Sequence, residues 1–67
     1  MPYVHVTLAA GRTLDAKRKL MASICEAVQE ALDTPPDSVR VWITEVPPGE
    51  MSVGGVPLDV LWADRGR

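Results

Sequence analysis

The segment Pro2-Tyr3-Val4-His5-Val6-Thr7-Leu8 opens the chain with a strict alternation of side chains. Side chains of a β-strand point to opposite faces in turn, so the even-numbered residues of this segment share one face and the odd-numbered residues share the other. The even face carries proline, valine and leucine, and the odd face carries tyrosine, histidine and threonine. This alternation of β-branched residues predicts a strand over residues 3–8.

A long amphipathic segment follows the first strand. Its main apolar positions recur every four residues, at Leu20, Ile24, Val28 and Leu32. This spacing predicts a helix from about Leu14 to Leu32 with one apolar stripe. Thr13 is a suitable N-cap, because its side-chain oxygen can accept a hydrogen bond from an amide of the first turn. The Pro35-Pro36 pair ends the helix, since proline cannot continue it.

A second strand is predicted over Val39–Val46, where Val39, Val41 and Ile43 alternate with Arg40, Trp42 and Thr44. A strand, a long helix and a strand in this order predict a right-handed β-α-β unit with two parallel strands. After Pro47-Pro48, the Gly54-Gly55 pair predicts a tight turn, and Val56–Trp62 is interpreted as a short strand or hairpin. The predicted fold class is therefore α/β (α+β), a β-α-β unit with a short C-terminal hairpin or strand.

The length of 67 residues predicts a single domain over residues 1–67. A chain of this size buries only about 60% of its unfolded surface, so small domains usually need a disulfide, a metal or a partner subunit. One cysteine, Cys25, excludes an intrachain disulfide, and one histidine, His5, excludes an ordinary Cys/His zinc site within one chain. The apolar share of 46% therefore favours an oligomer. Tyr3 and Trp42, on the strand face away from the helix, are expected to pack against another subunit.

The charge balance argues against several classes of partner. Seven Lys and Arg stand against nine Asp and Glu, for a net charge of −2, so nucleic acid is not expected as a partner. The chain has no apolar run near the roughly 20 residues that span a bilayer, so no membrane contact is expected. It also begins without the basic and apolar regions of a signal peptide. We therefore expect a cytoplasmic protein.

Pro2 is a candidate catalytic residue because it follows Met1 directly. Removal of Met1 would leave a free secondary amine at the start of an ordered strand. Such an amine is compact and can accept and return a proton. A Met-Pro start is also common in proteins without any such chemistry, so this interpretation needs further support from the chain.

Arg12 and Arg40 are the other two candidate catalytic residues. Two guanidinium groups suit a small acid with two carboxylates, and positive charge near an amine disfavours its protonation. Parallel pairing would place Arg40 near Pro2 at one edge of the sheet, whereas Arg12 would lie near the opposite end of its own strand. It could then reach a Pro2 site only across an interface or through a folded-back loop. Alternatively, each arginine is a solvated residue or an ion-pair partner of Glu45, Asp37 or Asp15.

Four motifs carry a resemblance to a known family. They are Met1-Pro2, Gly11-Arg12-Thr13, the run Ser38-Val39-Arg40-Val41-Trp42-Ile43-Thr44-Glu45, and Ser52-Val53-Gly54-Gly55. Through these motifs, the chain from Pro2 to Gly55 resembles the 4-oxalocrotonate tautomerase family without a gap.

The resemblance implies a homo-hexamer, built as a trimer of β-α-β dimers, with active sites at the subunit boundaries and no cofactor. It implies that Pro2 carries a proton between oxygen and carbon of the substrate. Arg12 would hold the distant carboxylate, and Arg40 would reach in from a neighbouring subunit to the 2-hydroxyl or 2-oxo end. Leu8, Trp42 and Met51 are the residues expected to line the substrate site.

Met51 departs from the family pattern, which commonly has phenylalanine at this position. Methionine is softer and more flexible, so it would form a less rigid apolar wall near the proline. A methionine here also resembles one subunit type of the related 3-chloroacrylic acid dehalogenases.

The function predicted from residues and resemblance together is that of an isomerase. It would interconvert enol and keto forms of 2-hydroxymuconate or of other 2-oxo or 2-hydroxy dienoic acids, as in the catabolism of aromatic compounds. One alternative is hydration or dehalogenation of a 3-haloacrylate, for which Glu45 or Glu50 would have to activate water. Another is a catalytically silent oligomer that binds carboxylates, which retention of Met1 would favour.

Overall fold

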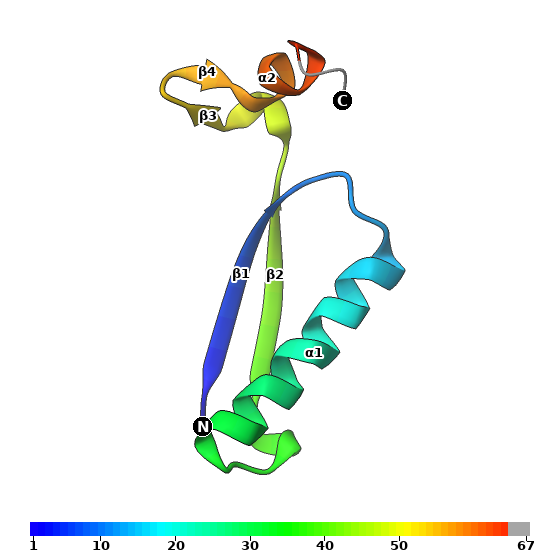
Figure 1. Cartoon of the computed structure of the whole chain (residues 1–67), viewed down its shortest axis with the longest axis vertical. Coiled ribbons are helices and arrows are strands. Elements are labelled where there is room, and N and C mark those ends of the chain that lie inside the picture. The colour runs from blue at the N-terminus through cyan, green and yellow to red at the C-terminus, as the bar shows by residue number, and fades with distance from the viewer. Residues whose placement is uncertain (65–67) are drawn as a thin grey trace.

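A computed structural model of the chain describes residues 1–64. Its elements, in chain order, are β1 (Tyr3–Ala9), α1 (Leu14–Leu32), the 3₁₀ turn η1 (Pro36–Ser38), β2 (Arg40–Val46), the 3₁₀ turn η2 (Pro48–Glu50), β3 (Ser52–Val53), β4 (Val56–Pro57) and α2 (Leu58–Asp64). Figure 1 shows that β1, β2 and α1 form one body and that η2, β3, β4 and α2 form an arm beyond the end of β2.

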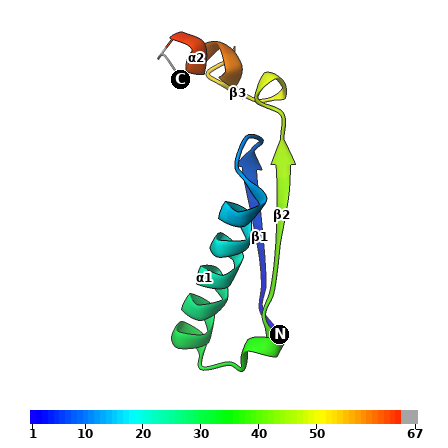
Figure 2. The same ribbon diagram turned by 90° about the vertical axis from the view of Figure 1, so that its right-hand side faces the viewer.

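The two long strands pair in parallel, as predicted. Tyr3 lies opposite Arg40 and Ala9 lies opposite Val46, with no break in register between them. Helix α1 runs back along one face of both strands, which Figure 2 shows from the side. The β-α-β unit with parallel strands is confirmed, and Val39, which was expected in the second strand, directly precedes it.

Helix α1 has the bounds that the apolar spacing predicted. The Thr13 hydroxyl accepts a 3.1 Å hydrogen bond from the amide of Ala16, so Thr13 is the N-cap. At the other end, Asp33 takes a left-handed conformation with φ of 54°, and its amide donates to the carbonyl of Gln29. The helix therefore ends at Leu32, three residues before Pro35, consistent with the predicted stop.

The C-terminal hairpin is confirmed, because β3 and β4 pair antiparallel, but the segment after it differs from the prediction. Gly54 and Gly55 form the expected turn, both with positive φ, and join β3 to β4. The strand predicted over Val56–Trp62 stops at Pro57, however, and Leu58–Asp64 is a helix. Leu58, Leu61 and Trp62 recur at helical spacing on the half-buried side of α2. The prediction rested on the Val and Leu content of this segment and did not take account of this helical spacing.

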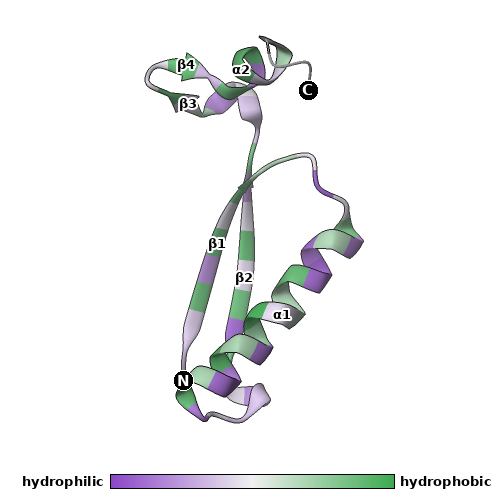
Figure 3. Ribbon diagram, viewed as in Figure 1, coloured by the Kyte–Doolittle hydropathy of each residue, from purple (hydrophilic) through white to green (hydrophobic). Residues whose placement is uncertain are grey.

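The isolated chain has no buried core: among residues 1–63, every side chain keeps part of its surface exposed. The radius of gyration is 15.2 Å, whereas a compact domain of this length has about 11 Å. Figure 3 shows apolar residues along both long strands and on the C-terminal arm. A chain with this much uncovered apolar surface is expected to complete its core with other subunits.

None of the helices in the described part of the chain is long and apolar enough to cross a membrane.

Candidate active site

Pro2 and Arg40 lie together at one end of the sheet, as parallel pairing predicted. The amide of Arg40 donates a 3.0 Å hydrogen bond to the carbonyl of Pro2, directly before the first paired residues. Pro2 is half-buried. In the full chain its nitrogen belongs to the Met1–Pro2 peptide bond, so it becomes a free amine only after Met1 is removed.

The Arg40 side chain is exposed and partly engaged. Its Nη1 atom donates a 2.7 Å hydrogen bond to the carbonyl of Asp37, on the turn that precedes β2. This single contact orients the guanidinium and leaves its other N–H groups available. A guanidinium held in this way can bind a carboxylate through two parallel hydrogen bonds.

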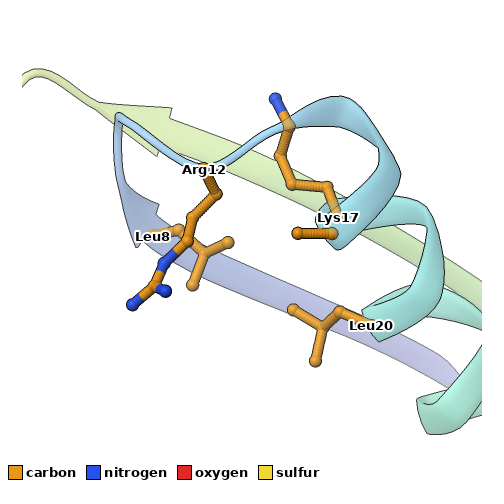
Figure 4. Close-up of a pocket in the computed structure, with 5 residues that line it drawn as sticks. Leu8, Arg12, Lys17 and Leu20 are labelled. Carbon is orange, nitrogen blue, oxygen red and sulfur yellow. The ribbon is translucent and has the colours of Figure 1, made fainter.

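Arg12 lies at the opposite end of the β-α-β body, beside a pocket of about 310 Å³. The pocket lies between the end of β1 and the start of α1, and is lined by Leu8, Arg12, Ala16, Lys17 and Leu20. Figure 4 shows the Arg12 guanidinium next to Leu8, pointing away from the head of Lys17. Within residues 1–64 the Arg12 side chain forms no ion pair or hydrogen bond, so it presents an unneutralised positive charge.

Lys17 and Glu45 form an ion pair that links α1 to β2. The distance between Lys17 Nζ and Glu45 Oε1 is 2.8 Å, and the two side chains are 19% and 35% exposed. Glu45 was expected either to pair with an arginine or to activate water as a free carboxylate. Its partner in the structure is instead Lys17. The ion pair also holds Lys17 in place beside the pocket of Arg12, which was not predicted. The position of Lys17, one turn after the N-cap Thr13, could have indicated that it lies near Arg12.

Within one chain the two halves of the predicted site are far apart. Pro2 and Arg40 flank the start of β1, and Leu8 and Arg12 flank its end. The seven residues of β1 rise about 3.3 Å each, which separates its ends by about 20 Å. A small dienoic acid cannot bridge this distance, so one chain alone does not bring Pro2 and Arg12 together.

Met51 also lies apart from Pro2 in the isolated chain, whereas the ring of Trp42 meets that of Tyr3, the residue after Pro2. Met51 is half-buried in the C-terminal arm, where its carbonyl accepts a 2.8 Å hydrogen bond from the amide of Leu58. Trp42, in the middle of β2, contributes to a second hollow of about 280 Å³ next to α1. Neither residue lines the pocket beside Arg12 and Leu8.

The sheet face away from α1 carries an aromatic cluster of Tyr3, His5 and Trp42. The rings of His5 and Trp42 are stacked, with centroids 5.1 Å apart, and Tyr3 meets Trp42 edge to face. His5 Nε2 also lies 2.8 Å from the hydroxyl of Thr44. Tyr3 is 66% exposed and Trp42 is 45% exposed, which fits the expected contact with another subunit better than a catalytic role.

Residues 1–64 contain no group of three or more His, Cys, Asp or Glu side chains that could hold a metal ion. Charged groups near the two ends of β1 include the two arginines and the Lys17–Glu45 pair.

Comparison with known proteins finds tautomerases that match most of the chain. The model of the Tautomerase family, described as tautomerase enzyme, matches residues 2–60. A protein of Ralstonia nicotianae named "Probable tautomerase RSp0893" is 47% identical over 57 residues, covering 85% of this chain and 81% of its own. The 2-hydroxymuconate tautomerase of Pseudomonas sp. strain CF600 is 39% identical over 57 residues, covering 85% and 90% of the two chains.

A solved structure agrees with these sequence relatives. A chain of the heterohexamer 4-oxalocrotonate tautomerase from Chloroflexus aurantiacus superimposes with a TM-score of 0.86 at 34% identity, covering 91% of this chain and 98% of its own. The matched region includes Pro2, both arginines and the C-terminal hairpin. The chain therefore belongs to the tautomerase enzymes, within the 4-oxalocrotonate tautomerase family.

Proposed function

We propose that this protein is a cofactor-independent isomerase that converts 2-hydroxymuconate, or a closely related 2-hydroxy dienoic acid, from its enol to its keto form. The observation that carries the proposal is the 39% identity to a 2-hydroxymuconate tautomerase over 85% of the chain. Pro2 at the start of β1 supports it, because removal of Met1 would expose a secondary amine there.

In the proposed mechanism, the neutral amine of Pro2 acts as the base. It takes the proton of the 2-hydroxyl, and the electrons of the broken O–H bond form the 2-oxo group. The double bonds shift along the chain, and a distal carbon takes the same proton back from the prolinium. Proton and charge balance without any other reactant, and the amine is regenerated.

The two arginines have separate roles in this proposal. Arg40 binds the 2-hydroxyl end and its carboxylate, where its positive charge stabilises negative charge that develops on oxygen. Arg12 holds the distant carboxylate, for which its unpaired guanidinium beside Leu8 is suited. Leu8, Trp42 and Met51 form apolar walls that keep water from the amine.

The active form is proposed to be a homo-hexamer arranged as a trimer of dimers. Support comes from the separation of about 20 Å between the ends of β1, since a substrate can contact both Pro2 and Arg12 only if they come from different subunits. The absence of buried side chains in residues 1–63 supports assembly independently of the chemistry. The similar Chloroflexus aurantiacus protein is a heterohexamer.

The dehalogenase alternative finds less support in the structure. It requires a carboxylate that activates water, and the Glu45 carboxylate is paired with Lys17 at 2.8 Å. Glu50 lies in η2, beyond the end of β2, so that, like Arg12, it would reach a Pro2 site only from a different subunit. The silent carboxylate-binding oligomer is the outcome expected if Met1 is retained.

The test combines the intact mass of the purified protein with an ultraviolet assay of 2-hydroxymuconate ketonisation on the same sample. A mass that lacks one methionine together with rapid turnover supports the proposal. A protein that lacks Met1 and assembles, but does not turn over 2-hydroxymuconate, would refute it.

A further inference from the structure

The pocket beside Arg12 contains two cations, but only one of them is unpaired. Arg12 and Lys17 both line it, together with the apolar side chains of Leu8, Ala16 and Leu20. The ammonium of Lys17 is bound to Glu45 at 2.8 Å, whereas Arg12 has no polar partner within residues 1–64. Figure 4 shows that the head of Lys17 points away from the Arg12 guanidinium, so that Lys17 lines the pocket with its carbon stem.

The Lys17–Glu45 ion pair can affect how the pocket beside Arg12 binds an anion, because Lys17 lines that pocket. Lys17 is only 19% exposed, so the pair is partly shielded from water and its charges are screened less than those on an open surface. Lysine is a point charge on a flexible four-carbon stem. Without Glu45, the ammonium would be free to turn toward any anion bound beside Arg12.

We propose that Glu45 is a specificity-determining residue that acts through Lys17. By holding the ammonium on the β2 side, it leaves Arg12 to bind the far end of the substrate alone, so that the pocket accepts a single carboxylate with moderate affinity. This inference rests on the proposed function, because it concerns the substrate end assigned to Arg12. Neither Glu45 nor Lys17 takes part in proton transfer.

The inference predicts opposite effects for the two partners of the pair. Glu45→Gln frees a cation beside Arg12 and strengthens dicarboxylate binding. Lys17→Met keeps an apolar stem in the pocket but leaves the Glu45 carboxylate uncompensated, which weakens binding. The double variant removes both charges and returns close to wild type. If the ion pair had only a structural role, breaking it would weaken binding in both single variants.

The experiment measures binding of muconate by titration calorimetry at low ionic strength. Muconate has two carboxylates but no 2-hydroxyl, so it is not converted and reports binding alone. We expect Glu45→Gln to bind about threefold to fivefold tighter, and Lys17→Met to bind weaker by a similar factor. The double variant should lie within about twofold of wild type, and all differences should shrink in high salt. Glu26→Gln, a change of the same charge on the exposed side of α1, is the matched control and should match wild type.

The outcomes separate this inference from the proposed function. Weaker binding in both single variants, or no change in either, would overturn the role of the pair even if the enzyme turns over 2-hydroxymuconate normally. No binding of muconate to the wild-type protein would overturn the inference as well, and the turnover assay would then decide the proposed function separately. The molecular mass of each variant in solution shows whether the compared proteins have the same assembly.

Discussion

The amide nitrogen of Arg40 lies 3.0 Å from the carbonyl oxygen of Pro2, and this hydrogen bond joins the first residue before β1 to the first residue of β2. Pro2 is therefore held at the corner of the sheet by the strand that carries Arg40. A terminal residue without such a contact would fray, and its amine would have no defined position. This contact makes the start of the chain suitable for a catalytic group.

Replacement of Pro2 tests the proposed base. We expect Pro2→Ala to lower kcat for 2-hydroxymuconate by about 10²–10⁴-fold, because a primary amine replaces the secondary amine and general acid–base groups contribute effects of this size. KM should change little, since Pro2 acts on the proton. Pro47→Ala, in the exposed segment after β2, is the matched control and should keep wild-type kcat. An unchanged kcat in Pro2→Ala, with Met1 removed, would refute the role of Pro2.

Arg12→Ala should mainly raise KM. The guanidinium has no polar partner among residues 1–64, so its loss should cost little stability and remove a charge-assisted contact with the substrate. We expect KM for 2-hydroxymuconate to rise about tenfold to a hundredfold. Arg18→Ala removes an exposed arginine of α1 as the control. Equal KM values for Arg12→Ala and Arg18→Ala would contradict the assignment.

Mixed oligomers test whether the site is shared between subunits. Because Pro2 and Arg12 flank opposite ends of β1, a subunit with Pro2→Ala and one with Arg12→Ala can together form an intact site. After unfolding and joint refolding in equal amounts, about a quarter of the sites should combine both wild-type residues by chance. Activity should therefore return in the mixture. If the mixture is only as active as the average of the two variants, each site comes from one chain.

The aromatic cluster on the outer sheet face should be needed for assembly. Trp42→Glu places a charge beside Tyr3 and His5, and a charge is costly to bury without a partner. We expect sedimentation velocity to show smaller species at concentrations where the wild-type protein is fully assembled. Glu26→Gln serves again as the surface control. A Trp42→Glu protein with the wild-type mass would show that this face is not part of the interface.

The N-cap of α1 gives a prediction for stability alone. Thr13→Ala removes the acceptor of the 3.1 Å hydrogen bond from Ala16, which should lower the free energy of unfolding by about 1 kcal/mol per chain. Thr13→Ser keeps a hydroxyl at the same position and should recover most of the loss. Denaturant unfolding of the three proteins at equal concentration measures both values, because the stability of an oligomer depends on concentration.

Local chemistry accounts for the parts of this protein that could be predicted from its sequence. Alternation over residues 3–8 and the four-residue spacing from Leu20 to Leu32 depend only on neighbours along the chain, so they predicted β1 and α1 correctly. Strand–helix–strand order then restricted the strands to parallel pairing, which placed Pro2 beside Arg40. Short segments are less determined by local pattern, and α2 was misinterpreted because seven residues contain only one repeat of the apolar spacing.

The sequence by itself thus determined the β-α-β unit, the cap at Thr13 and the presence of Pro2, Arg12 and Arg40, because these follow from residue type and local spacing. Strand order also placed Pro2 beside Arg40 and Arg12 at the other end of β1. Only the tertiary structure decided that Lys17 pairs with Glu45, and that the Arg12 guanidinium has no polar partner among residues 1–64. It also left every side chain of residues 1–63 partly exposed. These features depend on how distant segments pack, and a chain this short has too little interior to complete either a core or this site alone.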